Sequence, residues 1–337
     1  MTFGLPIAIS VGDPGGVGPR VSVVAALAAR AHVQSVLFGD AAQLQREATA
    51  LDLRLAECDE ATLGDLPHGV VGVVDTGRVA PALIALHAPT PEAGLAQVGA
   101  LDRAARAVRS GKARALVTGP TSKAAIASAG VAFVGQTEFL ARLDGRADDD
   151  VTMMFLGPKL RVALVTTHLA VAEVSAAITR ARVQRTVRHL ADALHRLYPD
   201  RAATLVVSGL NPHAGEGGMF GREDLDVVAP AIAQLASEPL FGEGRVILRG
   251  PEPAESVFRA AQRGDIDGVV AQYHDQATIA SKLLDWGAAV NTSWGLSFLR
   301  TSVDHGVAYD AARAGVVDAD GMHAALALAV RLTGSRA

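Results

Sequence analysis

The sequence is poor in the residues that build disulfides, membrane spans and nucleic-acid-binding surfaces. Its 337 residues include one cysteine, Cys58, which excludes an intramolecular disulfide and a metal site built from several thiolates. Lys and Arg number 31 against 35 Asp and Glu, and this balance argues against a surface for nucleic acid. The chain has no apolar run of about 18 residues, so we expect no membrane span.

The N-terminal segment also lacks the features of a secretory signal. Residues 1–6 contain neither a basic stretch nor a long apolar one, so we expect a cytoplasmic protein. Half of all residues are apolar, which excludes extensive disorder. The length is sufficient for two domains of about 100–200 residues each.

Short apolar runs alternate with helical patterns along the chain. Between residues 171 and 198, apolar residues recur at spacings of three and four, which predicts one long amphipathic helix, and residues 321–337 predict a final helix. The alternation predicts a largely parallel α/β sheet covered on both faces, with ligands at the carboxyl ends of the strands. The predicted strands are rich in Val, Ile and Leu and comprise residues 6–11, 33–39, 115–118, 162–166, 203–208 and 268–272.

Two predicted strand-to-helix junctions have unusual loops. The first, Gly12–Pro19, has four glycines, so its backbone can either turn tightly or approach a ligand closely. Its spacing is not that of the dinucleotide-binding fingerprint, and Asp13 either caps the next helix or faces a site. At the second junction, Thr121 or Ser122 is placed to cap a helix whose first amides favour an anion, and Lys123 adds charge.

Three of the ten histidines lie just past the ends of predicted strands: His168, His213 and His274. Because the carboxyl ends of parallel strands meet at one edge of a sheet, these imidazoles can converge in one crevice and bind a divalent metal. Three protein ligands leave coordination positions open, as in catalytic metal sites. Zinc, cobalt or manganese suits imidazole ligands better than magnesium does. The histidines outside these loops and Ser302–Gly306 are interpreted as surface or internally satisfied residues.

Three polar residues follow in an otherwise apolar stretch: Lys282, Asn291 and Arg300. Together they suit an anionic substrate, because Arg binds carboxylate or phosphate through two parallel hydrogen bonds. The alternative is that each is an ordinary surface residue.

The chain resembles a known family, the 4-hydroxythreonine-4-phosphate dehydrogenases of vitamin B6 biosynthesis. The resemblance runs nearly end to end and includes several long, uncommon motifs. They are Gly12–Pro19, Thr118–Pro120, Thr137–Leu140, Thr166–His168, Gly209–Gly221, Gly250–Ala254, Tyr273–Gln276 and Arg300–Gly306.

The resemblance implies a fold like that of isocitrate and isopropylmalate dehydrogenases, with two α/β domains around a cleft. Residues 1–130 with 295–337 would form the first domain, and residues 131–294 the second, which would carry most metal and substrate residues. It also implies a homodimer whose active site draws residues from both subunits, NAD or NADP as cofactor, and a divalent metal (zinc, cobalt, magnesium or manganese).

The resemblance further assigns roles to individual residues. The metal ligands would be His168, His213 and His274. Our own expectation for catalysis is that Lys282 acts as proton donor or acceptor and that Asp275 takes part. The substrate would bind to Gln136, Thr137, Lys282, Asn291 and Arg300. From the two loops Gly12–Pro19 and Ser302–Gly306, we expect the cofactor near Asp13, Gly15, Gly16, Asp304 and His305.

The implied reaction is oxidation of the 3-hydroxyl of 4-phosphooxy-threonine, followed by decarboxylation to 3-amino-2-oxopropyl phosphate. The chain departs from the family at Gln136, where the family has histidine, and at Glu255, Ala277 and Ser297. The first departure falls on a substrate contact, so a related dehydrogenase of phosphorylated threonate or erythronate, or of a cis-dihydrodiol carboxylate, is the alternative. Two further hypotheses are a metal-dependent lyase or hydrolase without nicotinamide, and a ligand-binding relative without activity.

Overall fold

The computed structural model describes residues 4–334, which form two compact α/β units. The first contains residues 4–148 and 296–334, and the second contains residues 149–295. We expected the first boundary after residue 130. The segment between the two positions instead packs on the first unit, because Leu140 is fully buried in its core and Phe133, Phe139 and Leu143 pack against the same cluster.

The first unit is built on a parallel sheet with the strand order β3-β4-β2-β1-β5-β12. Three of these strands match the predicted ones, because buried Val, Ile and Leu residues define them in the sequence. The strands are β1 (Ile7–Ser10), β2 (Ser35–Gly39), β3 (Ala56–Glu57), β4 (Gly72–Asp75), β5 (Ala115–Thr118) and β12 (Arg300–Ser302).

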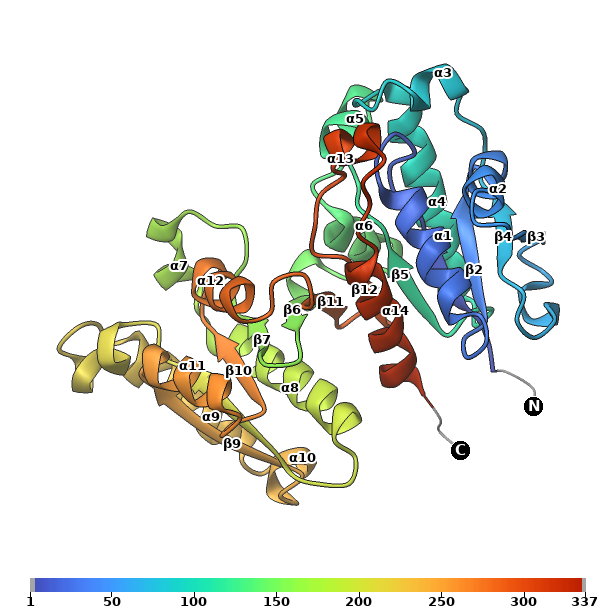
Figure 1. Ribbon diagram of the computed structural model, residues 1–337. Helices are drawn as coiled ribbons and strands as arrows, with labels where there is room; N and C mark the ends of the chain where they lie inside the picture. The colour runs from blue at the N-terminus through green and yellow to red at the C-terminus, as the bar shows by residue number, and fades with distance from the viewer. Residues whose placement is uncertain (1–3, 335–337) are drawn as a thin grey trace. The chain divides into compact units, whose positions relative to one another are not determined.

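Helices cover both faces of this sheet. Ala8, Phe38 and Leu116 pack in one cluster with buried residues of α4 (Pro91–Arg109). Side chains alternate along a strand, so Ile7 and Ile9 face the opposite side, where α1 (Gly18–Ala29) and α14 (Asp320–Thr333) lie side by side (Figure 1). The other helices are α2 (Ala41–Thr49), α3 (Pro81–Ile84), α5 (Lys123–Ser128), α6 (Gln136–Leu143) and α13 (Tyr309–Ala314).

The second unit has the strand order β11-β6-β7-β10-β8-β9. Strands β7, β10, β8 and β9 are parallel, whereas β6 pairs in antiparallel fashion with both β7 and β11. The predicted α/β sheet is thus confirmed as largely parallel. The strands are β6 (Thr152–Leu156), β7 (Arg161–Leu164), β8 (Ala203–Ser208), β9 (Val246–Glu252), β10 (Gly268–Ala271) and β11 (Val290–Trp294).

The predicted helix over residues 171–198 is two helices, α7 (Val171–Ala177) and α8 (Arg180–Leu197). The break occurs because the Thr179 hydroxyl accepts a hydrogen bond from the Arg182 amide and so starts a new helix. The predicted apolar stripe is confirmed on α8, where Val183, Val187, Leu190, Leu194 and Leu197 are all buried. The unit also contains α9 (Ala229–Leu235), α10 (Pro239–Gly242), α11 (Ala254–Arg263) and α12 (His274–Leu284).

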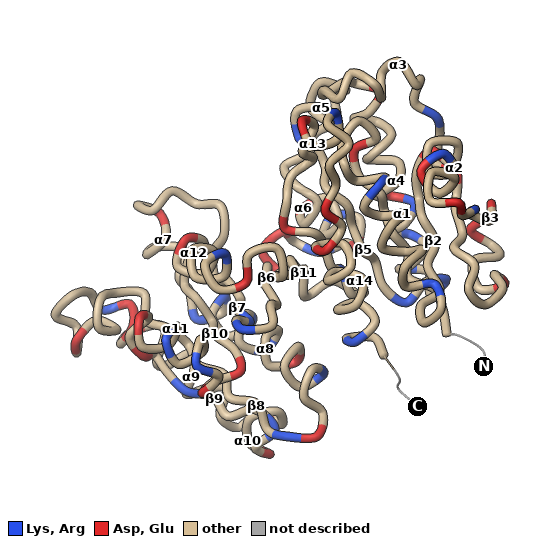
Figure 2. The backbone as a smooth tube through the Cα atoms, viewed as in Figure 1, with Lys and Arg blue, Asp and Glu red and all other residues tan. Residues whose placement is uncertain are grey.

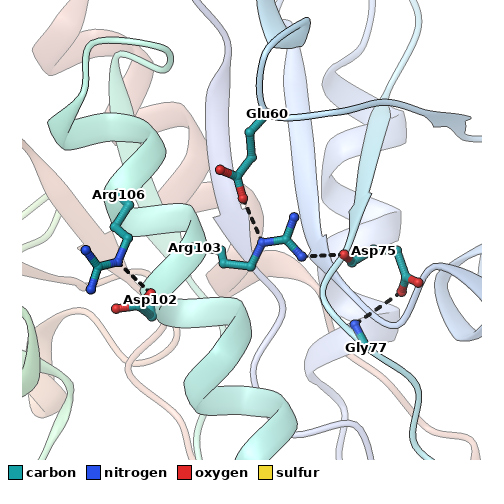
Figure 3. Close-up of polar contacts among 6 residues, drawn as sticks. All are labelled: Glu60, Asp75, Gly77, Asp102, Arg103 and Arg106. Carbon is teal, nitrogen blue, oxygen red and sulfur yellow. Dashed lines mark hydrogen bonds and ion pairs between the residues drawn. The ribbon is translucent and has the colours of Figure 1, made fainter.

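Charged residues of both signs are interspersed over each unit (Figure 2). On the first unit, Arg103 of α4 donates to the Glu60 carboxylate at 2.7 Å and to the Asp75 carbonyl, which fastens the helix to the end of β4 (Figure 3). Arg103 and Asp75 also line a surface cavity of about 490 Å³ together with half-buried Cys58, but no predicted site residue lines it.

The last predicted helix, residues 321–337, corresponds to α14, and residues 335–337 lie outside the described part of the chain. Within residues 4–334, no helix is both long and apolar enough to cross a membrane.

Candidate functional site

The three histidines predicted as metal ligands all lie on loops at one edge of the second unit's sheet. Strand β10 pairs with β7 on one side and with β8 on the other, and the three strands are parallel. His168 follows β7, His274 follows β10 and His213 follows β8. The predicted placement at adjacent carboxyl ends is therefore observed in the fold.

His168 and His274 form a close pair, with ring centroids 5.4 Å apart. Two imidazoles that bind one zinc ion at about 2.0–2.1 Å have their ring centres about 5 Å apart, so this spacing fits a shared metal. The Asp275 carboxylate lies 2.7 Å from Nδ1 of His274, which orients that ring and leaves Nε2 to bind a ligand. Asp275, predicted as catalytic, is therefore in direct contact with a predicted metal ligand.

His213 lies on an unusual left-handed turn, Pro212–Gly218. His213, Ala214 and Glu216 have φ angles of 54°, 51° and 42°, a region that non-glycine residues rarely adopt. Such strain is found mainly where surrounding contacts impose it at functional sites. The sequence shows the loop's polar composition but not this conformation.

A buried carboxylate, that of Asp224, holds the start of this turn. It accepts hydrogen bonds from the Leu210 amide at 2.7 Å, from the Asn211 amide at 3.0 Å and from the Asn211 side chain at 3.1 Å. Asp224 is 1% exposed, so these bonds are shielded from water. Sequence reasoning missed Asp224, because nothing in Arg222-Glu223-Asp224 distinguishes it from a surface acid.

One chain brings His168 and His274 together but not His213. Within the described residues, no three His, Cys, Asp or Glu side chains are close enough together to hold a metal ion. The His213 ring instead lies 6.2 Å from the ring of the half-exposed Phe220.

Lys282 and Asn291 lie elsewhere in the same unit. Lys282 is exposed on α12, eight residues after His274, a rise of about 12 Å along the helix. Its Nζ lies 5.6 Å from the centre of the Trp286 ring. Asn291 is on β11, opposite Phe155 of β6. In one chain, Lys282 is therefore not adjacent to the histidine pair.

In the first unit, Arg300 and Gln136 are in direct contact. The Arg300 guanidinium is buried and donates to the Thr118 hydroxyl at 2.9 Å and to Oε1 of Gln136 at 2.9 Å. Burial lowers the pKa of Arg300 to about 10, with the Glu138 carboxylate opposing that shift, so the side chain is charged at neutral pH. Both of these acceptors are neutral oxygens, and they orient the guanidinium.

The Gln136 amide is held from both ends. While Oε1 accepts from Arg300, Nε2 donates to the Gly119 carbonyl at 3.0 Å and to the Thr121 hydroxyl at 3.1 Å. Thr137 is the next residue of α6. The five predicted substrate residues therefore lie in two groups, with Gln136, Thr137 and Arg300 in the first unit and Lys282 and Asn291 in the second.

The glycine-rich loop Gly12–Pro19 is a tight turn packed against protein. A Cβ on Gly12 would lie 2.2 Å from the Pro120 carbonyl oxygen, and one on Gly16 would lie 2.2 Å from Val307. These glycines therefore allow close packing between loops. The same packing brings Asp13, Gly15 and Gly16 beside the segment that carries Asp304 and exposed His305, so the predicted cofactor neighbours share one region.

Asp13 is fully buried and does not cap α1, whose first turn has no side-chain cap. Its carboxylate accepts from the Gly15 amide at 2.8 Å, from Nε2 of Gln97 at 3.0 Å and from the Tyr309 hydroxyl at 2.9 Å. Burial raises the pKa of Asp13, and these bonds oppose the shift. Gln97 and Tyr309 were missed from the sequence. The second predicted cap is confirmed, because Ser122 accepts from the Ala125 amide at the start of α5.

Comparison with known proteins identifies the family. Residues 31–329 match the pyridoxal phosphate biosynthetic protein PdxA family. The 4-hydroxythreonine-4-phosphate dehydrogenase of Geobacter metallireducens is 39% identical over 332 residues, which cover 97% of this chain and 95% of that protein.

Two solved structures extend this similarity. The 4-hydroxythreonine-4-phosphate dehydrogenase of Klebsiella pneumoniae has a TM-score of 0.82 at 31% identity, covering 98% of this chain and 100% of that one. A terephthalate 1,2-cis-dihydrodiol dehydrogenase of Burkholderia xenovorans has a TM-score of 0.70 at 30% identity, covering 98% of both chains. The resemblance inferred from the sequence motifs is confirmed, and the chain belongs to the pyridoxal phosphate biosynthetic protein PdxA family.

Proposed function

We propose that this protein is a metal-dependent dehydrogenase that uses NAD or NADP to oxidise the 3-hydroxyl of 4-phosphooxy-threonine. The proposal rests above all on the similarity to 4-hydroxythreonine-4-phosphate dehydrogenases over nearly the whole chain. Oxidation of that carbon gives a β-keto acid, which loses CO2 to form 3-amino-2-oxopropyl phosphate. Because this chemistry draws on the cellular nicotinamide pool, we further propose that the protein works in the cytoplasm.

We propose His168, His213 and His274 as the ligands of a divalent metal, with zinc, cobalt or manganese favoured over magnesium by the nitrogen donors. The 5.4 Å spacing of the His168 and His274 rings supports this set, as does the Asp275 contact that orients His274. When bound, such an ion supplies positive charge that stabilises the alkoxide of the reacting hydroxyl.

We propose that Arg300, Gln136 and Thr137 bind an anionic end of the substrate, and that Asn291 orients it. The buried, charged guanidinium of Arg300 is held by Thr118 and Gln136, so its direction is fixed before substrate binds. Lys282 is proposed as the residue that exchanges a proton with the substrate. Asp13, Gly15, Gly16, Asp304 and His305 are proposed as cofactor neighbours, with the buried Asp13 shaping its loop.

We also propose that two copies of the chain form the active unit, with the site completed at their interface. Ile279, Leu283 and Trp286 are 60%, 81% and 81% exposed and share one face of α12 and its end. Met219 and Phe220, just after the His213 turn, are also exposed. Apolar patches of this kind are typical of subunit interfaces. An interface over these segments would allow His213 and Lys282 to join a site with residues of a second copy.

The direct test is NADH formation from 4-phosphooxy-threonine, followed by absorbance. We expect turnover that stops after treatment with a chelator and returns when zinc, cobalt or manganese is added. Turnover that the chelator leaves unchanged would exclude the metal. Calorimetric titration with NAD and NADP separates this function from a lyase or hydrolase, which would bind neither.

A second substrate class is favoured by one observation, the neutral amide of Gln136 bound to Arg300. The chain is also similar to a terephthalate 1,2-cis-dihydrodiol dehydrogenase. We therefore propose, as the alternative, oxidation of a cis-dihydrodiol carboxylate or of phosphorylated threonate or erythronate. A panel of these compounds beside 4-phosphooxy-threonine, ranked by kcat/KM, decides between them.

A further inference from the structure

We infer that Gln276 is a positioning residue that holds the His213 loop against the start of α12 in the same chain, so that each loop carries its histidine to a metal centre from a defined place. The inference rests on the proposed metal centre. Gln276 lies two residues after His274, in the first turn of α12. Its side-chain amide reaches back to the ends of the two neighbouring strands β10 and β8. Its hydrogen bonds go to Ser208, Gly209 and Gln272, which are outside the proposed metal and substrate sets, so it would act through the backbone that carries those residues.

The Gln276 amide makes three hydrogen bonds. Oε1 accepts from the Gln272 backbone amide at 2.7 Å and from the Ser208 hydroxyl at 3.0 Å, and Nε2 donates to the Gly209 carbonyl at 2.9 Å. One side chain therefore ties the beginning of α12 to the last residue of β8 and to the residue that follows it.

The bond to Gly209 reaches the His213 turn directly. A Cβ on Gly209 would lie 2.7 Å from the Cα of Ala214, so the Gly209 backbone is packed against the residue next to His213. A shift of Gly209 must therefore move the turn. The turn holds left-handed residues that keep this conformation only while their surroundings impose it, so it is sensitive to such a shift.

Gln272 extends the same network to the third histidine. Its side-chain Nε2 donates to the Ser208 carbonyl at 2.7 Å, and its backbone carbonyl accepts from the Thr166 hydroxyl at 2.8 Å, two residues before His168. Gln272 is fully buried, which shields these bonds from water. The His168 and His274 loops are thus joined through Gln272, whereas the His213 loop is joined to them through both Gln272 and Gln276.

The test is Co2+ binding to the full chain, followed by visible absorption, which reports ligand number and geometry independently of turnover. In Gln276→Met, which removes all three bonds at similar volume, we expect the dissociation constant for Co2+ to rise about tenfold or more, with altered absorption bands. Gln276→Glu keeps the acceptor and loses the bond to Gly209, so it should weaken binding similarly if Met is not tolerated. The matched control is Gln184→Met on α8, whose amide donates to Gln234 at 2.7 Å and to the Ala231 carbonyl at 3.3 Å, both on α9 and not on the histidine loops.

The outcomes separate this inference from the proposed function. The positioning role is supported if wild type and Gln184→Met bind Co2+ with the same affinity and both Gln276 variants bind it more weakly. Unchanged affinity and spectrum in both Gln276 variants would overturn it while leaving the metal centre in place. Wild-type protein that binds no Co2+ would overturn the metal centre itself.

Discussion

Acidification should destabilise the second unit through His189, which lies on α8. Its Nδ1 is 2.8 Å from the Thr152 hydroxyl, and a Cβ on Gly295 would lie 2.8 Å from its ring. Burial, with help from Arg185 and Arg188, lowers the pKa of His189 from 6.5 to about 4, although Asp192 and Asp150 oppose the shift. The sequence analysis interpreted His189 as either a surface residue or an internally satisfied one, and its hydrogen bond with Thr152 shows that it is internally satisfied.

The direction of the effect follows from where the proton binds. Between pH 6.5 and 4 the unfolded chain protonates His189 and the folded chain does not, so folding becomes less favourable as pH falls. The contribution of this neutral histidine is fully present above pH 6.5 and is lost as pH falls through about 4. At about 1.4 kcal/mol per pH unit, the loss is about 3 kcal/mol.

The assay is urea unfolding followed by tryptophan fluorescence, because both tryptophans, Trp286 and Trp294, belong to the second unit. In His189→Gln we expect lower stability than wild type at pH 7.5, since packing and the bond to Thr152 are lost. That difference should shrink by about 3 kcal/mol by pH 4. If the free energies of unfolding of wild type and variant differ by the same amount at both pH values, the reasoning is refuted. Measurements between pH 7 and 8, where this difference should not change, provide the internal control.

Three substitutions test other contacts. Arg300→Lys keeps the charge but loses the planar fork, so KM for the anionic substrate should rise about tenfold or more in steady-state kinetics; an unchanged KM would exclude Arg300 from substrate binding. Asp224→Asn replaces a buried carboxylate that accepts three hydrogen bonds. The free energy of unfolding in urea should fall by about 2–4 kcal/mol, and the His213 turn should become sensitive to proteolysis. A turn that stays resistant to protease would contradict the role of Asp224. Gly16→Ala places a Cβ 2.2 Å from Val307 and should lower the thermal midpoint by several degrees, while an unchanged midpoint would show that the loops can separate freely.

The sequence predicts those parts of the molecule that depend on local periodicity. The apolar stripe of α8 is visible because burial requires Val183, Val187 and Leu190 at helical spacing. The predicted strands 162–166, 203–208 and 268–272 correspond to β7, β8 and β10, and their parallel pairing places the three histidine loops at one edge. The break at Thr179 was missed, because the apolar pattern continues across it and only a cap reveals it.

Other features depend on contacts between distant residues and have no local signal. The bond between Arg300 and Gln136 joins positions 164 residues apart. The left-handed backbone of His213 depends on packing around a turn that no residue preference predicts. The glycines of the first loop were consistent with either a ligand or a tight turn, and the close approach of Gly12 to Pro120 accounts for them through packing. Each of these three features becomes visible only in the folded chain.

The most direct test of the central claim is metal-dependent NADH formation by His213→Ala beside wild-type protein, each stripped with a chelator and then supplied with Co2+. The account predicts that Co2+ restores turnover of 4-phosphooxy-threonine, or of the alternative substrate, in the wild type and restores none in the variant. Equal restoration in both proteins would remove His213 from the ligand set and contradict a metal centre built from these three strand-end histidines.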